Sequence, residues 1–418
     1  MTLSEKSLEP KQQSAVDWIY NHDRSVLIAP TGAGKTIICL TAIAELIEDD
    51  FFGISKVMVA CPAKVVPVWA KEAKKWAHTS ALKVVMLDGS ASERSESLLK
   101  EADVVVVSLN NLKWLLDQNH KCDGVIIDEL SKASGKQARG LTSKRKAGGL
   151  KWRVGMTATP VAQDFQKLYG MMRIIDDGVA LGTNRDKYLN EYFYPDYNGY
   201  NWTLRDDASQ KIMARVAPYV HMVEDTKVND LPECHYHEIR FDMPEKSREV
   251  YNRMKKDMFA EDVEAANEAV KSGKLRQIAS GFMYREDSIK VSLDTARIEQ
   301  LKDWVWSLEG RPGLVFYEYI EQSTWFDDFD DDIRFAQIHS MSHGVDGLQY
   351  QFSDILFLQP IWSRDATEQA VGRVWLTGQT NPVNVTTLIC DDTLDDLVVA
   401  RVEDRAEFMK LFRKHLKG

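Results

Sequence analysis

The sequence predicts an α/β protein that contains two parallel-sheet lobes in tandem, with helical extensions. In the first third of the chain, short apolar runs alternate with amphipathic stretches, and a second series of apolar runs begins near Gly313. This alternation is typical of βαβ units and parallel sheets. A length of 418 residues suits two or three domains.

The first series of apolar runs predicts six strands. They are residues 26–29, 56–61, 83–87, 103–108, 124–128 and 152–156. A continuous run such as VVVV at 104–107 suits a strand that is buried on both faces of the sheet. The amphipathic stretches 36–47 and 68–76 predict helices that cover this sheet.

Residues 161–225 predict a helical extension of the first lobe, in which the aromatic side chains of 188–202 form a small core. A linker is expected around 228–234, so we divide the chain into lobes of residues 1–228 and 229–418. The second lobe is expected to hold a strand at 234–241, a helical insertion at about 244–281 and a helical end at 394–416. Its other expected strands are 314–317, 333–338, 354–358 and 383–388.

Composition restricts the class of partner. A net charge of −10 is unlike a basic nucleic-acid-binding domain, so a nucleic-acid surface must be a local patch. Between 132 and 153 there are eight positive charges and no acid, which indicates phosphate binding, with a solvated loop as the alternative. These residues are Lys132, Lys136, Arg139, Lys144, Arg145, Lys146, Lys151 and Arg153. Three tryptophans are expected in cores, with stacking on bases as the less favoured alternative: Trp69, Trp76 and Trp114.

Other patterns argue against a metal framework or a membrane protein. The five cysteines are scattered and form no CxxC pair, which indicates neither a disulfide framework nor a zinc ribbon. The CHYH sequence at 234–237 lacks a second ligand pair and predicts a strand, and the acidic run at 327–332 predicts a solvated loop. No apolar run reaches about 18 residues, and the polar N-terminus lacks a signal core, so we expect a cytoplasmic protein.

The segment APTGAGKT at 29–36 nearly matches the phosphate-binding loop GxxxxGK[ST], with Ala in place of the first Gly. It follows an apolar strand and opens a helix, which is the context that this motif requires. Backbone N–H groups would surround the phosphates of ATP, Lys35 would reach the β and γ phosphates, and Thr36 would bind magnesium. The predicted nucleotide-binding residues of this loop are Thr31, Gly32, Ala33, Gly34, Lys35 and Thr36.

A second motif, GVIIDE at 124–129, ends an apolar strand with two carboxylates. Asp128 would hold magnesium, directly or through water. Glu129 would orient the attacking water, because phosphoryl transfer depends on a positioned nucleophile. Together with the upstream loop, the pair predicts hydrolysis of ATP.

Five ordered motifs resemble the superfamily-two helicase motor. They are LEPKQ at 8–12, APTGAGKT at 29–36, DEL at 128–130, MTATP at 156–160 and QAVGR at 369–373. Finer features resemble its Swi/Snf-related branch, especially the compact forms of phages and prophages. These features are CPAKV at 61–65 followed by Trp69 and Glu72, LGTNRDKYLNEYF at 181–193, LRQIASG at 275–281, VFYEY at 315–319 and QAVGRVWLTGQ at 369–379. The resemblance extends from Leu8 to about Val399.

The resemblance implies two RecA-like lobes with ATP in the cleft between them. It also implies individual roles. Gln12 would recognise the adenine, and Lys64 would contact the phosphates of the tracked strand. Gln369 and Arg373 would close over the γ-phosphate. Thr157 and Thr159 match the motif that couples hydrolysis to lobe movement. Further nucleic-acid candidates are Ser108, Lys144, Arg145 and Lys146.

Two positions depart from the family pattern. The second arginine of QxxGRxxR would fall at 376, where this chain has Leu376. Loss of an arginine finger can cost about 10³–10⁵ in rate, so hydrolysis is slow unless Arg373, Arg364 or a partner compensates. The loop SMSHGVDGLQ at 340–349 has one residue more than the family pattern near Gly347.

The leading hypothesis is therefore an ATP- and magnesium-dependent translocase on double-stranded DNA that remodels DNA junctions or protein–DNA complexes. Branched DNA and single strands are alternative substrates. Two other functions stay open: a nucleic-acid-binding module with a degenerate ATPase, and an RNA helicase. We expect targeting by a protein partner or by DNA structure, no membrane association, and the bacterial host cytoplasm if a phage encodes the chain.

Overall fold

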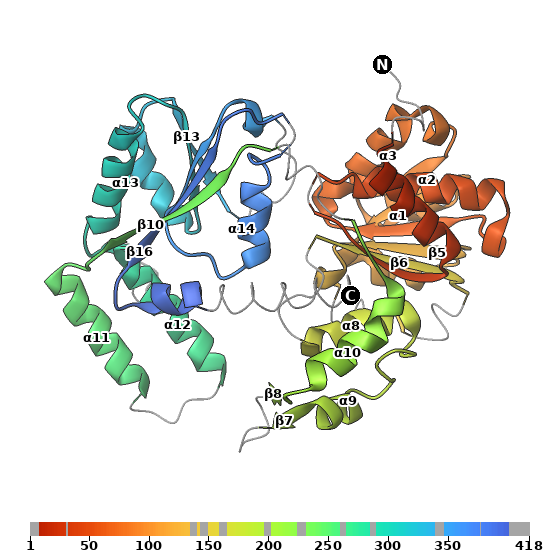
Figure 1. The fold of residues 1–418 in the computed structure, drawn as a ribbon, viewed down its shortest axis with the longest axis horizontal. Coiled ribbons are helices and arrows are strands. Elements are labelled where there is room, and N and C mark those ends of the chain that lie inside the picture. Colours follow the sequence, from red (N-terminus) through yellow and green to blue (C-terminus); the bar gives the residue numbers. More distant parts are fainter. Residues whose placement is uncertain are drawn as a thin grey trace. The chain divides into compact units, whose positions relative to one another are not determined.

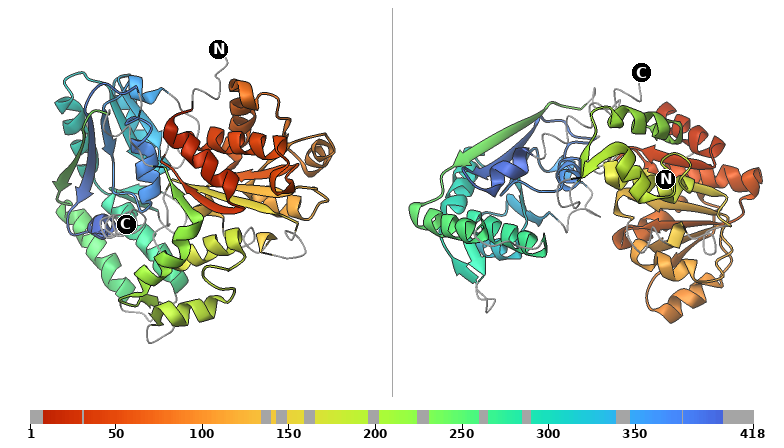
Figure 2. Two further views of the ribbon diagram at one scale, coloured as in Figure 1. Left: turned by 45° about the vertical axis from the view of Figure 1, so that its right-hand side comes forward. Right: turned by 90° about the horizontal axis from the view of Figure 1, so that it is seen from below.

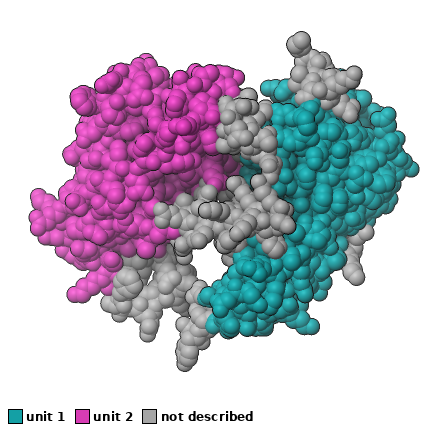
Figure 3. All heavy atoms as spheres, in the orientation of Figure 1, with its two compact units in different colours: residues 1–225, 408–418 teal, residues 226–407 magenta. Residues whose placement is uncertain are grey.

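The computed structural model describes residues 8–30, 32–133, 140–142, 149–158, 165–195, 202–223, 231–259, 265–284, 290–338, 347–376 and 378–400. The described residues divide into two units, one formed by residues up to 223 and the other by residues from 231 on (Figures 1 and 3). Each unit is built around its own parallel sheet. Every helix in the described ranges is too short or too polar to span a bilayer.

The sheet of the first unit has seven strands in the order β3-β4-β2-β5-β6-β1-β9, and every neighbouring pair is parallel. The strands are β1 (Arg24–Ile28), β2 (Val57–Cys61), β3 (Val84–Leu87), β4 (Val104–Ser108), β5 (Gly124–Asp128), β6 (Trp152–Thr157) and β9 (Val220–Met222). The first six are the strands that the sequence predicts. All residues of β2, β4 and β5 are buried, as expected for strands that are covered on both faces.

Strand β9 differs from the prediction, because it lies in the segment that was expected to be a helical extension. It pairs with β1 in parallel register and completes one edge of the sheet. A strand of three residues, VHM, is too short to show a periodic pattern. The extension therefore ends before residue 220, and the chain returns to the main sheet before it enters the second unit.

Helices cover both faces of the first sheet (Figure 2). On one face lie α1 (Pro10–Asn21), α2 (Lys35–Glu48) and α3 (Val66–Lys75), whose apolar side chains pack with Val57, Val59 and Cys61. On the other face, α5 (Leu112–Leu116), α8 (Phe165–Asp176) and α10 (Ala208–Val216) pack with Met58 and Ala60. Successive residues of β2 thus enter opposite cores, as the pleat of a strand requires. Two of the three tryptophans, Trp69 and Trp76, are buried in the first of these cores, as expected.

The extension of the first unit is partly helical. It contains α8, α9 (Arg185–Tyr192) and α10, together with a hairpin, β7 (Phe193–Pro195) and β8 (Trp202–Leu204), that the sequence did not predict. Its aromatic side chains form the expected small core. The Tyr188 ring lies 4.9 Å from that of Tyr169, and its hydroxyl donates to the Phe165 carbonyl at 2.7 Å.

The second unit has a five-stranded parallel sheet in the order β10-β16-β15-β13-β14. The strands are β10 (Cys234–Phe241), β13 (Gly313–Tyr317), β14 (Ile333–Gln337), β15 (Asp354–Phe357) and β16 (Val383–Cys390), and all five match predicted strands. The CHYH sequence is the start of β10, as expected. At the predicted solvated loop, Asp330, Asp331 and Asp332 are exposed.

Helices also cover the second sheet. α11 (Glu245–Phe259), α12 (Ala265–Ala279) and α13 (Ala296–Ser307) follow β10, and side chains of all three share one core with Val315 and Leu356. α14 (Arg364–Val371) packs on the opposite face, where Ala370 joins Phe316 and Phe357. A short hairpin, β11 (Phe282–Tyr284) and β12 (Lys290–Ser292), joins α12 to α13. The two sheets confirm the predicted fold class of two RecA-like lobes.

Candidate nucleotide site

The predicted nucleotide residues of the first unit gather at one edge of its sheet. Because all seven strands are parallel, their carboxyl ends lie at the same edge, where open α/β sheets bind ligands. The phosphate-binding loop follows β1, and Asp128 ends β5. Between them lies β6, whose last residue, Thr157, accepts a hydrogen bond from the Ala29 N–H at 3.0 Å. The fold thus brings together motifs that are about a hundred residues apart in the chain.

The phosphate-binding loop has the backbone shape that its glycines permit. Gly32 and Gly34 have φ angles of +84° and +81°, in the left-handed region that favours glycine. Gly34 is the N-cap of α2, so the positive end of this helix faces the loop. The Lys35 ammonium donates to the carbonyls of Ala29 at 2.9 Å and Pro30 at 3.1 Å. Thr36 lies half-buried in the first turn of α2, and Thr31 lies outside the described residues.

Gln12 lies directly against this loop. Its side-chain oxygen accepts from the Glu9 N–H at 2.9 Å, which completes a capping box at the start of α1. Its amide nitrogen donates to the Ala33 carbonyl at 3.1 Å. A Cβ atom on Gly34 would lie only 2.5 Å from the same nitrogen. The side chain of Gln12 is therefore held beside the phosphate-binding loop, although the two are about twenty residues apart in sequence.

Asp128 is a buried carboxyl, only 7% exposed. Burial raises its pKa to about 6, and the charge of Glu129 adds to the rise, whereas the charge of Lys35 and the indole of Trp69 lower it. No ion pair joins Asp128 to any residue in the described part of the chain. Glu129 follows with a φ of +61°, an unusual conformation for a residue other than glycine and one that is common at functional sites.

Trp69 is a neighbour of Asp128 that sequence reasoning missed. We expected this tryptophan in a core, and it is fully buried there. The indole N–H lowers the pKa of the nearby Asp128 carboxyl, but it makes no hydrogen bond of standard geometry. The signal for this proximity was absent from the sequence, because it depends on the packing of α3 beside the end of β5.

The donor set fits magnesium held jointly with a nucleotide. Among the described residues, no group of three or more His, Cys, Asp or Glu side chains is placed to hold a metal by itself. Magnesium in phosphate-binding-loop proteins is held by one hydroxyl, a carboxylate and the phosphate oxygens of the nucleotide. The half-buried hydroxyl of Thr36 and the uncompensated carboxyl of Asp128 suit this arrangement.

In the second unit, the predicted residues lie on and just after α14. The Ser363 hydroxyl accepts from the Ala366 N–H at 3.2 Å and caps this helix. Gln369 lies in the last turn, and Arg373 follows the helix; both are half-buried, as is Leu376. Their action on a nucleotide stays a prediction. The side chain of Arg364 and the loop at 340–346 lie outside the described residues.

The predicted nucleic-acid residues have different environments. Lys64 is exposed in a turn directly after β2, whereas Ser108 is buried at the end of β4. Both strands end at the edge that carries the nucleotide motifs. Lys144, Arg145 and Lys146, and also Thr159 of the coupling motif, lie outside the described residues.

The basic segment needs one correction. Arg153 was expected to belong to a phosphate-binding surface, but it is 3% exposed within β6. Its guanidinium donates to the Ile174 carbonyl at 2.9 Å and to the Asp177 carboxylate at 3.0 Å. Lys151, by contrast, is exposed and donates to the Gly53 carbonyl at 2.9 Å. Charge counted along the sequence does not distinguish a structural cation inside a strand from a cation on a surface loop.

A model of the SNF2-related domain matches residues 11–290, which is more than half of the chain. The chain belongs to the SNF2-related family. This membership confirms the resemblance seen in the motifs. The family membership identifies the chain as an ATP-hydrolysing enzyme of the Snf2 type.

Several relatives are similar to this chain. A protein named p41 of Acyrthosiphon pisum secondary endosymbiont phage 1 is 26% identical over 98% of both chains. The ATP-dependent helicase MG018 of Mycoplasma genitalium is 21% identical over 97% of this chain and 42% of its own length. The DNA repair and recombination protein RAD54B of Gallus gallus is 24% identical over 44% of this chain and 22% of its own length. The chain thus spans less than half of the length of MG018 or RAD54B.

Among solved structures, the Sulfolobus solfataricus SWI2/SNF2 ATPase core in complex with dsDNA is similar, with a TM-score of 0.48 and 17% identity. The alignment covers 97% of this chain and 92% of that one.

Proposed function

We propose that this chain is a DNA-dependent ATPase that translocates along double-stranded DNA. The observation that carries the proposal is the joint position of Lys35, Asp128 and Glu129 at the edge of the first sheet. Relatives such as RAD54B, a DNA repair and recombination protein, favour DNA over RNA as the polymer.

The residues of the first unit have separable roles in this proposal. Backbone N–H groups of the phosphate-binding loop bind the phosphates, and Lys35 exchanges its bonds to Ala29 and Pro30 for bonds to phosphate oxygens. Thr36 and Asp128 would hold magnesium, which when bound would supply positive charge to offset that of the phosphates. Glu129 orients the attacking water, and Gln12 recognises the adenine.

The remaining roles are proposed from the resemblance of the motifs to those of the family. Gln369 and Arg373 stabilise the γ-phosphate, and Thr157 and Thr159 couple hydrolysis to movement of the lobes. Lys64 and Ser108 contact the tracked strand, together with the basic residues Lys144, Arg145 and Lys146. Movement along duplex DNA then drives remodelling of branched junctions or removal of bound proteins. A protein partner or DNA structure directs the enzyme to its target in the host cytoplasm.

Steady-state ATPase assays with duplex DNA, single-stranded DNA and RNA test the proposal. We expect the largest stimulation by duplex DNA, and its loss in Lys35→Ala and Glu129→Gln. Stimulation by RNA alone would instead indicate an RNA helicase. Equal turnover with and without every nucleic acid would contradict the motor function.

Leu376 favours one second candidate, a nucleic-acid-binding module with a slow ATPase. The position holds an apolar, half-buried side chain where the family pattern has an arginine. Comparison of kcat for the wild type and Leu376→Arg distinguishes the two functions. A kcat at least about tenfold higher in Leu376→Arg would support the module with a slow ATPase, since an arginine finger contributes about 10³–10⁵ in rate. A high wild-type kcat that the substitution leaves unchanged would exclude this second candidate.

A further inference from the structure

A short segment of the second unit, residues 358–363, connects β15 to α14, and we call it the β15–α14 segment. It ends at Ser363, whose hydroxyl caps α14, so its conformation determines where this helix begins. α14 in turn carries Gln369 and leads to Arg373, the residues that we propose act on the γ-phosphate. Whatever fixes this segment therefore fixes the position of both residues.

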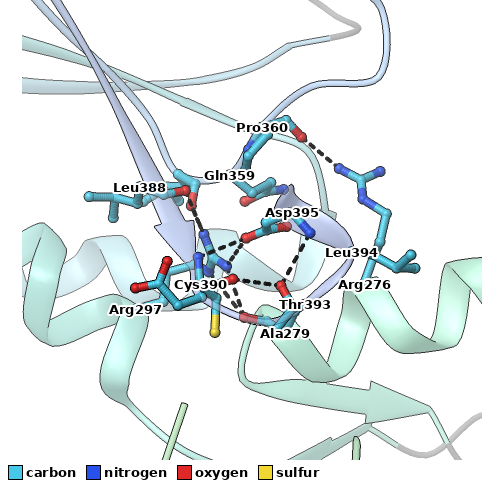
Figure 4. A network of polar contacts seen from close by, with 12 residues as sticks. Arg276, Ala279, Arg297, Gln359, Pro360, Leu388, Cys390, Thr393, Leu394 and Asp395 are labelled. Atoms are coloured by element: carbon cyan, nitrogen blue, oxygen red, sulfur yellow. Dashed lines mark hydrogen bonds and ion pairs between the residues drawn. The ribbon is translucent and has the colours of Figure 1, made fainter. Parts of the chain in front are cut away.

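Arg276, on α12, makes three kinds of contact, two of them with this segment. It is only 5% exposed. Its two terminal nitrogens donate to the two carboxylate oxygens of Glu318 at 3.0 and 2.7 Å, a bidentate pair. One of them also donates to the Pro360 carbonyl at 2.8 Å (Figure 4). The guanidinium carbon lies 5.6 Å from the centroid of the Trp362 ring, within the range of a cation–π contact.

Two more buried polar side chains contact the start of the same segment. Arg297 of α13, which is 1% exposed, donates to the Leu358 carbonyl and to the Asp395 carboxylate, the latter at 2.7 Å (Figure 4). The amide of Gln322 donates to the side-chain oxygen of Gln359 at 2.9 Å. Side chains from three separate parts of the second unit thus hold residues 358, 359 and 360.

The burial of these charges argues for a specific role. A buried ion pair contributes little net stability compared with apolar packing, because both charges lose their hydration. Backbone carbonyls that turn away from a sheet, however, need donors when they are buried, and a guanidinium offers several in a fixed plane. Arg276 fits this requirement, since it satisfies the Pro360 carbonyl while its charge is balanced by Glu318.

We propose that Arg276 is a positioning residue for ATP hydrolysis, which fixes the β15–α14 segment and through it Gln369 and Arg373. The inference rests on the proposed function of those two residues. Arg276 itself touches neither nucleotide nor water in this scheme. Its contribution is the geometry of α14, and a small displacement of a catalytic group is enough to slow a reaction greatly.

The conservative variant Arg276→Lys tests the inference. Lysine keeps the charge opposite Glu318, but it lacks the fork that reaches Glu318 and Pro360 together. We expect kcat to fall about tenfold while KM for ATP changes less than about twofold, because Lys35 and Gln12 in the first unit are unaltered. The matched control is Arg240→Lys, an exposed arginine of the same unit that pairs with Glu238, Asp391 and Asp396; its kcat should be unchanged.

Hydrogen exchange provides a readout that needs no activity. In Arg276→Lys, peptides that cover 358–376 should exchange about tenfold faster than in the wild type, while peptides of the first unit keep their rates. If the wild type proves inactive with every nucleic acid, the proposed function fails, and exchange still tests the contact. Unchanged exchange and unchanged kcat in this variant would overturn the positioning role.

A second variant distinguishes the positioning role from a general loss of folding. Trp362→Leu removes the aromatic face that meets Arg276 at a half-buried position of the segment itself. We expect the same loss of kcat, and no further loss when it is combined with Arg276→Lys, because both act through one segment. If the losses of kcat in the two single variants multiply in the double variant, the inference is overturned. It is also overturned if the variants lower only the unfolding midpoint.

Discussion

The buried carboxyl of Asp128 lowers the free energy of unfolding at neutral pH. The carboxyl of Asp128 is buried beside Glu129, and these surroundings raise its pKa from 3.8 to about 6. Between these two values the folded protein binds more protons than the unfolded chain. Stability therefore falls as pH rises from about 4 to about 6, and the cost remains at neutral pH. A cation that binds Asp128 would relieve this cost, as expected of a metal ligand.

We expect Asp128→Asn to make the metal-free protein more stable at pH 7.5 while it abolishes hydrolysis. The raised pKa corresponds to at most about 3 kcal/mol, so a gain of about 1–2 kcal/mol is reasonable. Thermal unfolding in a chelator measures this gain, with Asp206→Asn, at an exposed position of the same unit, as the control. A metal-free Asp128→Asn protein that is no more stable than the wild type would contradict the account of this carboxyl.

A histidine at the edge of the first sheet should show the opposite pH dependence. Burial lowers the pKa of His221, and the neighbouring His22 lowers it further. The unfolded chain therefore binds a proton more readily, so stability is retained above about pH 6.5 and is lost as the pH falls below it.

We expect His221→Phe to reduce this acid sensitivity, because phenylalanine does not titrate and can keep the ring contact with Trp18, whose centroid lies 5.4 Å away. Unfolding midpoints measured from pH 5 to 8 provide the test. Parallel pH profiles for the two proteins would show that His221 does not contribute.

At the scale of elements, the sequence predicts most of the two sheets. Runs such as VVVV at 104–107 are long and apolar enough to identify buried strands. β9 and the hairpins were not predictable, because strands of three residues carry no period. Arg153 was misassigned for a different reason: a buried cation is recognised only through its partners, here Ile174 and Asp177.

The phosphate-binding loop illustrates what sequence can and cannot supply about a site. The motif itself identifies the residues that would bind phosphate. The contact between Gln12 and Ala33 depends on how α1 packs beside α2, and only the resemblance pointed to it. The order of the strands, which brings Asp128 to the same edge, is likewise a property of the folded sheet.

Gly34→Ala tests the contact between α1 and the loop. The new Cβ would displace the side chain of Gln12, whereas a Cβ on Gly32 meets nothing within 4 Å. Both positions have positive φ, so both substitutions carry a similar backbone cost of about 1–2 kcal/mol.

We therefore expect Gly34→Ala, but not Gly32→Ala, to lose about tenfold in preference for ATP over GTP, since Gln12 no longer reaches the adenine. Competition binding of the two nucleotides measures this preference. An equal effect of both variants would assign the loss to the loop backbone and not to Gln12.

At the scale of the whole molecule, the chain is a pair of lobes, each with a parallel sheet and apolar cores on both of its faces. In the proposed function, the first lobe binds the phosphates of ATP. The second lobe supplies Gln369 and Arg373, and it has Leu376 where the family pattern has a second arginine. The central claim of the proposed function is that hydrolysis of ATP by these residues drives movement along double-stranded DNA.

Displacement of a third strand from a DNA triplex measures that claim most directly, because only a protein that moves along the duplex with ATP removes the strand. We predict ATP-dependent displacement by the wild-type protein, and none by Glu129→Gln, which still binds ATP. Hydrolysis stimulated by duplex DNA without any displacement, or displacement that continues in Glu129→Gln, would contradict a translocating motor.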